Sequence, residues 1–197
     1  MIDLPGVLSA AAEVQRFCQE RGWRFCFIGG VAVQRWGEPR LTQDVDLTLL
    51  TGLGGEEGFV DPLLAEFTPR FADARAFALH HRVVLAKTRT GVHLDVALGA
   101  LPFEERSVCR ASGWRIGGAA TLITCSAEDL VVHKAFAGRD LDWSDLERIL
   151  VRQHGKLDLE QVRTELKPLL ELKGEPGGLI RLEALVATVT GRLQERS

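Results

Sequence analysis

The chain has 197 residues, of which 46% are hydrophobic and 26% charged, and its formal net charge is -3. This composition is typical of a globular protein with a sizeable core, built as one domain or as one domain with a small appendage. It gives no indication of a strongly basic nucleic-acid-binding protein, and the longest apolar run, residues 25–33, is too short to span a bilayer.

The cysteines and the N-terminal residues indicate in which cellular compartment we expect the protein. The sequence has neither a CxxC pair nor the spacing of zinc ligands, and its four cysteines are Cys18, Cys26, Cys109 and Cys125. We interpret them as reduced thiols of a cytoplasmic protein. The first residues show no basic segment followed by an apolar one, so we expect neither a signal peptide nor a membrane association.

In the first half of the chain, residue periodicity predicts helices and strands in alternation. The expected elements are a helix over residues 7–21, a strand over 24–28, a short helix over 31–36, a strand over 44–50 and a hairpin of strands over 82–88 and 92–98. Gly29 and Gly30 end the first strand, and a turn over residues 37–43 precedes the second.

The second half is mainly helical. A strand pair over residues 114–124 is split by Gly117 and Gly118, and Ser126 has the position of a helix N-cap. The expected helices cover residues 126–137, 142–153, 158–172 and 177–193. We therefore predict an α+β fold, with a small mixed β-sheet core over residues 1–105 and a mainly helical C-terminal region over 106–197 that completes the cleft.

Two aspartates stand two residues apart in the expected strand over 44–50. Side chains at this spacing project from the same face of a strand, so the carboxylates of Asp44 and Asp46 should lie close together. Close carboxylates repel each other unless a cation lies between them, and oxygen ligands of this kind suit Mg²⁺. A pair formed by chance on a surface strand is the alternative.

Asp95 lies within the otherwise apolar run 92–98, where an unpaired carboxylate is costly to bury. It should therefore face a metal ion or a partner, and an ion pair with an arginine is the simpler alternative.

Gly29 and Gly30 lie between a strand and a helix N-terminus, where free N–H groups and the helix dipole favour a phosphate. Arg40 and Thr42 in the following turn are candidates to bind phosphate or orient the carboxylates. A tight turn and its solvation are the alternatives.

The segment IGGVAVQRWGEPRLTQDVDL, residues 28–47, resembles the signature of the DNA polymerase beta-type nucleotidyltransferases. That signature joins two small residues, an Asp-x-Asp pair and a third carboxylate on a later strand, the place that Asp95 fills. The segment is similar to two branches, the AbiEii-type toxins of bacterial toxin–antitoxin and phage-exclusion systems and the aminoglycoside and lincosamide nucleotidyltransferases. In AbiEii proteins a serine is common where this chain has Gly30, which leaves the phosphate contact to backbone groups.

The segment SAEDLVVHKAFAGRDLDWSDLERIL, residues 126–150, resembles the AbiEii branch. The resemblance implies that Lys134 meets the triphosphate and that a following aspartate, Asp142 or Asp145, is functional. A solvent-facing helical lysine is the alternative for Lys134. No acidic residue lies three or four positions away to form a local helical ion pair with it.

The resemblance implies an enzyme that moves an NMP from an NTP to an acceptor hydroxyl, with two Mg²⁺ ions at Asp44, Asp46 and Asp95. The residues expected to bind the nucleotide are Gly29, Gly30, Arg40, Thr42, Lys134 and Asp142. The implied acceptor is an RNA, such as a tRNA, or a protein, and an antitoxin is the implied partner. The alternatives are a small-molecule nucleotidyltransferase and a catalytically inactive binding module, against which the complete set of three carboxylates argues.

The middle of the chain is locally basic through Arg70, Arg75, Arg82, Lys87 and Arg89. Such a segment is usually a solvated face of the protein, and guidance of a polyanionic acceptor is the functional alternative.

Overall fold

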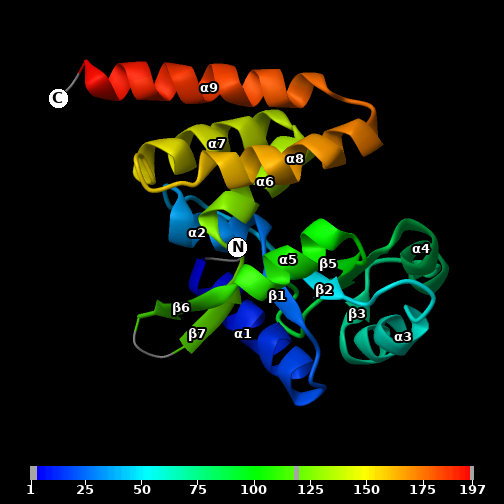
Figure 1. The fold of residues 1–197 in the computed structure, drawn as a ribbon. Coiled ribbons are helices and arrows are strands. Elements are labelled where there is room, and N and C mark those ends of the chain that lie inside the picture. Colours follow the sequence, from blue (N-terminus) through cyan, green and yellow to red (C-terminus); the bar gives the residue numbers. More distant parts are fainter. Residues whose placement is uncertain (1–3, 118–119, 196–197) are drawn as a thin grey trace. The chain divides into compact units, whose positions relative to one another are not determined.

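The computed structural model describes residues 4–117 and 120–195 (Figure 1). They form two compact units. The first consists of the residues up to Val31 and of Leu41–Cys125, and the second consists of Ala32–Arg40 and the residues from Ser126 on. Gly118, which was expected to help split a strand pair, lies outside the described residues.

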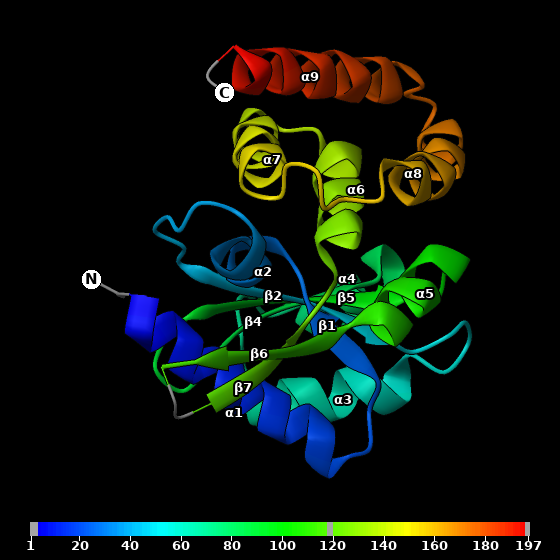
Figure 2. The same ribbon diagram turned by 60° about the vertical axis from the view of Figure 1, so that its left-hand side comes forward.

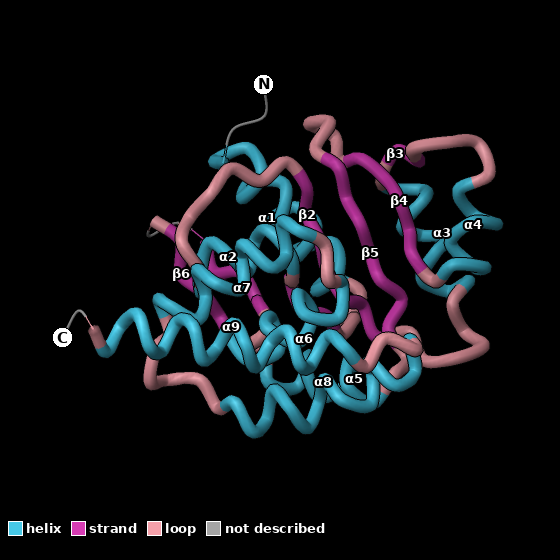
Figure 3. The backbone as a smooth tube through the Cα atoms, turned by 90° about the horizontal axis from the view of Figure 1, so that it is seen from above, coloured by secondary structure: helices cyan, strands magenta, loops and turns pink. Residues whose placement is uncertain are grey.

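The first unit is built on a seven-stranded mixed sheet with the strand order β3-β4-β5-β2-β1-β7-β6. Its strands are β1 (Phe25–Phe27), β2 (Asp44–Leu50), β3 (Thr68–Pro69), β4 (Val83–Lys87), β5 (His93–Gly99), β6 (Ser112–Ile116) and β7 (Ala120–Thr124). The pairs β2–β5 and β1–β7 are parallel and the other pairs antiparallel. In Figure 3, β2, β5 and β4 run side by side, with β3 beyond β4.

Helices cover the sheet. They are α1 (Leu4–Glu20), α3 (Glu57–Glu66), α4 (Ala74–His81) and α5 (Pro102–Arg110), and α2 (Gly29–Trp36) begins in this unit and continues into the second. Figure 2 shows α1 and α3 on the same side of the sheet. The structure confirms the helices and strands expected before residue 100, and it adds α3, β3, α4 and α5. The first unit extends past residue 105 and includes the β6–β7 hairpin.

The second unit contains α6 (Ala127–Ala137), α7 (Asp140–Arg152), α8 (Leu159–Lys173) and α9 (Gly177–Gln194). The Ser126 side chain accepts a hydrogen bond from Asp129 N–H and caps α6 as expected. The predicted α+β fold, a mixed sheet followed by a helical C-terminal part, is confirmed. Over the described part of the chain, every helix is too short or too polar to cross a membrane.

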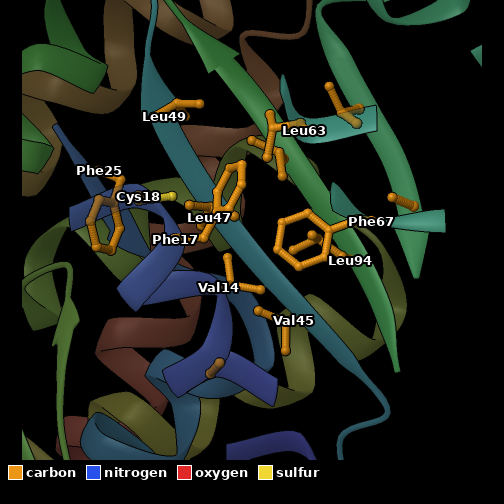
Figure 4. Packing of buried hydrophobic residues seen from close by; sticks show 14 of the residues in the cluster. Val14, Phe17, Cys18, Phe25, Val45, Leu47, Leu49, Leu63, Phe67 and Leu94 are labelled. Atoms are coloured by element: carbon orange, nitrogen blue, oxygen red, sulfur yellow. The ribbon is translucent and has the colours of Figure 1, made fainter. Parts of the chain in front are cut away.

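Alternation along the first half of β2 places apolar side chains in the core and the two aspartates on the opposite face of the sheet. Val45, Leu47 and Leu49 are completely buried and belong to the apolar cluster that includes residues of α1 (Figure 4). Asp44 and Asp46 alternate with them and are partly exposed. Since full burial of such a side chain stabilises the fold by about 1.5–3 kcal/mol, a one-residue shift that buried the aspartates instead is strongly disfavoured.

Candidate functional site

The candidate carboxylates come from two neighbouring strands. β2 pairs in parallel with β5, with Asp46 opposite Asp95 and Asp44 opposite His93. Residues at paired positions point to the same face of a sheet, and both strands alternate partly exposed with buried residues from this end. The structure therefore brings the three aspartates onto one face, with Asp95 on β5, a later strand, as the resemblance implied.

Each of the three aspartates has a polar contact on this face of the sheet. The Gly30 N–H donates to Asp46 Oδ2 at 3.4 Å, and His93 Nδ1 lies 3.3 Å from Asp44 Oδ1. Arg70 Nη2 donates to Asp95 Oδ1 at 2.8 Å. The arginine partner that was the simpler alternative for Asp95 is thus present, yet the Asp95 side chain remains 35% exposed beside Asp46.

The two glycines are required by close packing against this face. A Cβ added to Gly29 would lie 2.1 Å from Asp46 Oδ2, and one added to Gly30 would lie 2.1 Å from Thr42 Oγ1. Gly29 also has a φ of 53°, which L side chains rarely adopt. The backbone at the start of α2 therefore approaches the Asp46 carboxylate more closely than any other residue type would allow.

We expect Gly29→Ala to impair the site as well as the fold. The methyl group would displace the Asp46 carboxylate, and strain of this kind costs about 1–3 kcal/mol. Gly22→Ala is a matched control, because Gly22 has a φ of 64° but an added Cβ would meet nothing within 4 Å. Urea denaturation and a transfer assay compare the two variants. If Gly29→Ala transfers nucleotide as well as Gly22→Ala does, the close approach is unimportant for activity.

A second group of predicted residues gathers within the helical unit. Lys134 Nζ lies 2.8 Å from Asp142 Oδ1 and 2.8 Å from Asp145 Oδ2. Arg40 donates to both oxygens of Asp145, at 2.6 and 2.7 Å, and Arg139 Nε donates to Asp142 Oδ2 at 2.6 Å. The five side chains form a chain of alternating charges in which both candidate aspartates contact the lysine.

This cluster is buried. The side chains of Lys134, Asp142 and Asp145 are 7%, 2% and 0% exposed, so the alternative of a solvent-facing Lys134 is wrong. Burial opposes ionisation of both aspartates, but hydrogen bonds from Arg139 and Lys134 outweigh it and lower the pKa of Asp142. For Asp145, hydrogen bonds from Arg40 and Lys134 overcome the same effect and also leave a lowered pKa.

The donor atoms of the first unit suit a magnesium ion. Within the described residues, no group of three or more His, Cys, Asp or Glu side chains is arranged to hold a metal ion by itself. Magnesium does not require such a cage, because it retains waters and binds through one or two carboxylates together with substrate phosphates. Asp44, 49% exposed, and Asp46 offer oxygen ligands of that kind, with Asp95 beside them.

The basic middle segment is largely charge-compensated. Four of its five cations form ion pairs, which are Arg70–Asp95, Arg75–Asp61, Arg82–Glu56 and Arg89–Glu66. These pairs favour the interpretation of a solvated face over that of a polyanion-guiding surface. Arg70 differs from the other three arginines because its partner, Asp95, is a candidate site residue. The sequence suggested an arginine as an alternative partner of Asp95 but gave no signal that it would be Arg70.

The chain is similar to a known protein family over most of its length. Residues 17–196 match the family described as "Nucleotidyl transferase AbiEii toxin, Type IV TA system". No curated protein sequence matches the chain.

Two solved structures are similar to the chain. One is an antigenic nucleotidyltransferase-like protein from Paracoccidioides brasiliensis, with 12% sequence identity, a TM-score of 0.56 and 94% of each chain covered. This likeness shows the nucleotidyltransferase-like fold. The other is the antibiotic-resistance factor ANT(2'')-Ia, with 13% identity, a TM-score of 0.44 and coverage of 95% of this chain and 92% of that one.

Proposed function

We propose, since the chain belongs to the AbiEii family of nucleotidyl transferases, that it moves an NMP from an NTP to an acceptor hydroxyl with the help of magnesium. The observation that carries the proposal is the placement of Asp44, Asp46 and Asp95 on one sheet face beside the two glycines. Neighbouring carboxylates on one face repel each other, and a bound divalent cation would relieve this repulsion.

In the proposed reaction, Asp44 and Asp46 would hold Mg²⁺ and Asp95 would complete the ligand set. Bound magnesium supplies stabilisation of charge on the attacking and leaving oxygens. Asp95 also accepts the proton of the acceptor hydroxyl as that oxygen attacks the α-phosphorus and pyrophosphate leaves. The N–H groups at the start of α2, at Gly29 and Gly30, and the Thr42 hydroxyl would donate to phosphate oxygens, and for Gly30 the phosphate would replace the 3.4 Å hydrogen bond to Asp46 Oδ2.

In the second unit, we assign Arg40, Lys134 and Asp142 to nucleotide binding, as the resemblance to AbiEii proteins implies. The cluster to which they belong contains the cations Arg40, Lys134 and Arg139. Cations of this kind favour the anionic triphosphate. Asp142 would then act by holding Lys134 and Arg139 in place.

We further propose that the acceptor is an RNA, such as a tRNA, or a protein, and that the chain is a toxin paired with an antitoxin. The family description, which names a type IV toxin–antitoxin system, supports this role.

The decisive experiment incubates the protein and Mg²⁺ with each α-³²P-labelled NTP in turn, together with total RNA, with a protein extract or with a panel of aminoglycosides. We expect label on RNA or protein, with EDTA abolishing it. Label on an aminoglycoside would replace the toxin proposal by a small-molecule transferase. Absence of label with every NTP and acceptor would reject the proposed transfer reaction.

A further inference from the structure

Arg70 lies on the same row of the sheet as two of the candidate site carboxylates. It directly follows β3, and its N–H donates to Leu85 O at 3.1 Å. Leu85 on β4 is opposite Asp95 on β5, which in turn is opposite Asp46 on β2. The backbone of Arg70 is therefore anchored at the level of the site, two strands away from Asp95.

The side chain of Arg70 reaches back across β4 toward the site. Its Nη2 donates to Asp95 Oδ1 at 2.8 Å, and the two side chains are 23% and 35% exposed. By comparison, Arg75 pairs with Asp61 at 49% and 53% exposure, as an ordinary surface pair. Exposed pairs contribute little because water screens them and both side chains lose freedom. The Arg70 contact is more enclosed, and its carboxylate belongs to the proposed active site.

The neighbouring carboxylates need a compensating group. Asp46 and Asp95 occupy paired positions on strands that are about 4.8 Å apart, so their charges repel each other. A guanidinium beside Asp95 offsets this repulsion and restricts the orientation of the carboxylate through its planar donors. A lysine at the same place would supply the charge without the fixed direction.

We propose that Arg70 is a positioning residue that holds Asp95 in the orientation required for nucleotide transfer; this inference rests on the proposed function. The same fixed positive charge opposes the approach of a divalent cation to the carboxylates. Arg70 therefore has two opposite effects, since it weakens metal binding while it speeds the reaction by orienting Asp95. A merely structural ion pair would not separate these two properties.

The test compares Arg70→Gln, which removes the charge, with Arg70→Lys, which retains it, and with Arg75→Gln as a control in the same segment. Binding of Mn²⁺ alone, without nucleotide, is followed by electron paramagnetic resonance, and kcat and KM for the NTP are measured with Mg²⁺. Thermal melts show whether each variant is folded at the assay temperature.

For Arg70→Gln we expect Mn²⁺ affinity to rise about tenfold, because a like charge near the cation is removed. We expect kcat to fall on the order of a hundredfold from misplacement of Asp95, with KM for the NTP changed by less than about twofold. Arg70→Lys should keep the wild-type Mn²⁺ affinity and recover part of kcat, and Arg75→Gln should match the wild type in all three properties.

Unchanged kcat and Mn²⁺ affinity in Arg70→Gln would overturn the inference while leaving the proposed function in place. A parallel loss of kcat, Mn²⁺ affinity and melting temperature would also overturn it, because it would show a purely structural role. If the wild-type protein neither binds Mn²⁺ nor transfers nucleotide, the proposed function itself fails and the role of Arg70 fails with it.

Discussion

Asp46→Asn is expected to reduce nucleotide transfer on the order of a thousandfold, the upper end of the loss seen when one group that stabilises transition-state charge is removed. Asp46 is central in the proposed site, since it lies opposite Asp95 and beside Gly29 and Gly30. Asparagine keeps the shape of the side chain and an oxygen that can accept from the Gly30 N–H. It removes the negative charge that a metal ion requires.

The same substitution should leave the fold intact. Asp46 is partly exposed, and its charge repels that of Asp95, so neutralisation relieves a repulsion instead of breaking the core. We expect the free energy of unfolding of Asp46→Asn to be within about 0.5 kcal/mol of the wild-type value or above it. Loss of activity without loss of stability is the pattern of a functional residue.

Asp73→Asn is a suitable control. Asp73 is exposed, and its side chain makes no capping hydrogen bond to α4. The two variants are compared in the labelled-NTP assay, by urea denaturation and by Mn²⁺ binding. Asp73→Asn should match the wild type throughout, whereas Asp46→Asn should lose both transfer and Mn²⁺ binding. A normal rate of transfer in Asp46→Asn would remove this aspartate from the mechanism.

The strands of the site could be predicted because their periodicity is local. Along β2, the apolar residues Val45, Leu47 and Leu49 alternate with the polar residues Asp44, Asp46 and Thr48, and this alternation is visible in the sequence itself. It places Asp44 and Asp46 on one face without any knowledge of the neighbouring strands. The position of Asp95 beside them was an expectation drawn from family resemblance, and the parallel register of β2 and β5 supports it.

The added helices lack a strong local signal. In α3, Pro62 interrupts the helical pattern, and only Val60 and Leu63 are buried. In α4 the buried residues are Ala74 and Ala78, which are too small to indicate an apolar face. These segments become helical because the sheet offers a surface to pack against, which is a property of the tertiary structure.

Contacts between distant segments were the least accessible from the sequence. The Arg70–Asp95 pair depends on the order β3-β4-β5, which no local pattern specifies. Similarly, the partners of Lys134 are not on its own helix but on α7. The residues three or four positions from Lys134 therefore gave no indication of these partners, and only the fold distinguishes a buried lysine from a surface one.

Lys134→Ala is expected to lower the free energy of unfolding at neutral pH by about 3 kcal/mol, because it leaves two buried carboxylates without their shared cation. Lys134 is 7% exposed and lies within 2.8 Å of Asp142 and Asp145. The loss should be at the lower end of the range for broken buried pairs, since Arg139 and Arg40 still contact the two aspartates. A solvent-facing lysine would give at most about 0.5 kcal/mol.

The effect should depend on pH. Asp142 and Asp145 have pKa values lowered from the ordinary 3.8, so they contribute stability above that pH and lose it as the pH falls through their folded-state values. The Lys134→Ala variant lacks the Lys134 hydrogen bonds that lower both pKa values, so it has already lost part of this stability at neutral pH. The difference in unfolding free energy between wild type and variant should therefore be largest near pH 7 and should shrink progressively below the ordinary value of 3.8.

Urea denaturation at a series of pH values measures both expectations, with Lys167→Ala as the control on an exposed position of α8. The double variant Lys134→Ala/Asp142→Asn should lose less stability than the sum of the two single variants, because the residues contact each other. Nucleotide transfer by Lys134→Ala is then measured at a temperature where the variant is folded, which separates its role in the cluster from its role toward the triphosphate. A stability equal to that of Lys167→Ala at all pH values would show that Lys134 is not held between the two aspartates in solution.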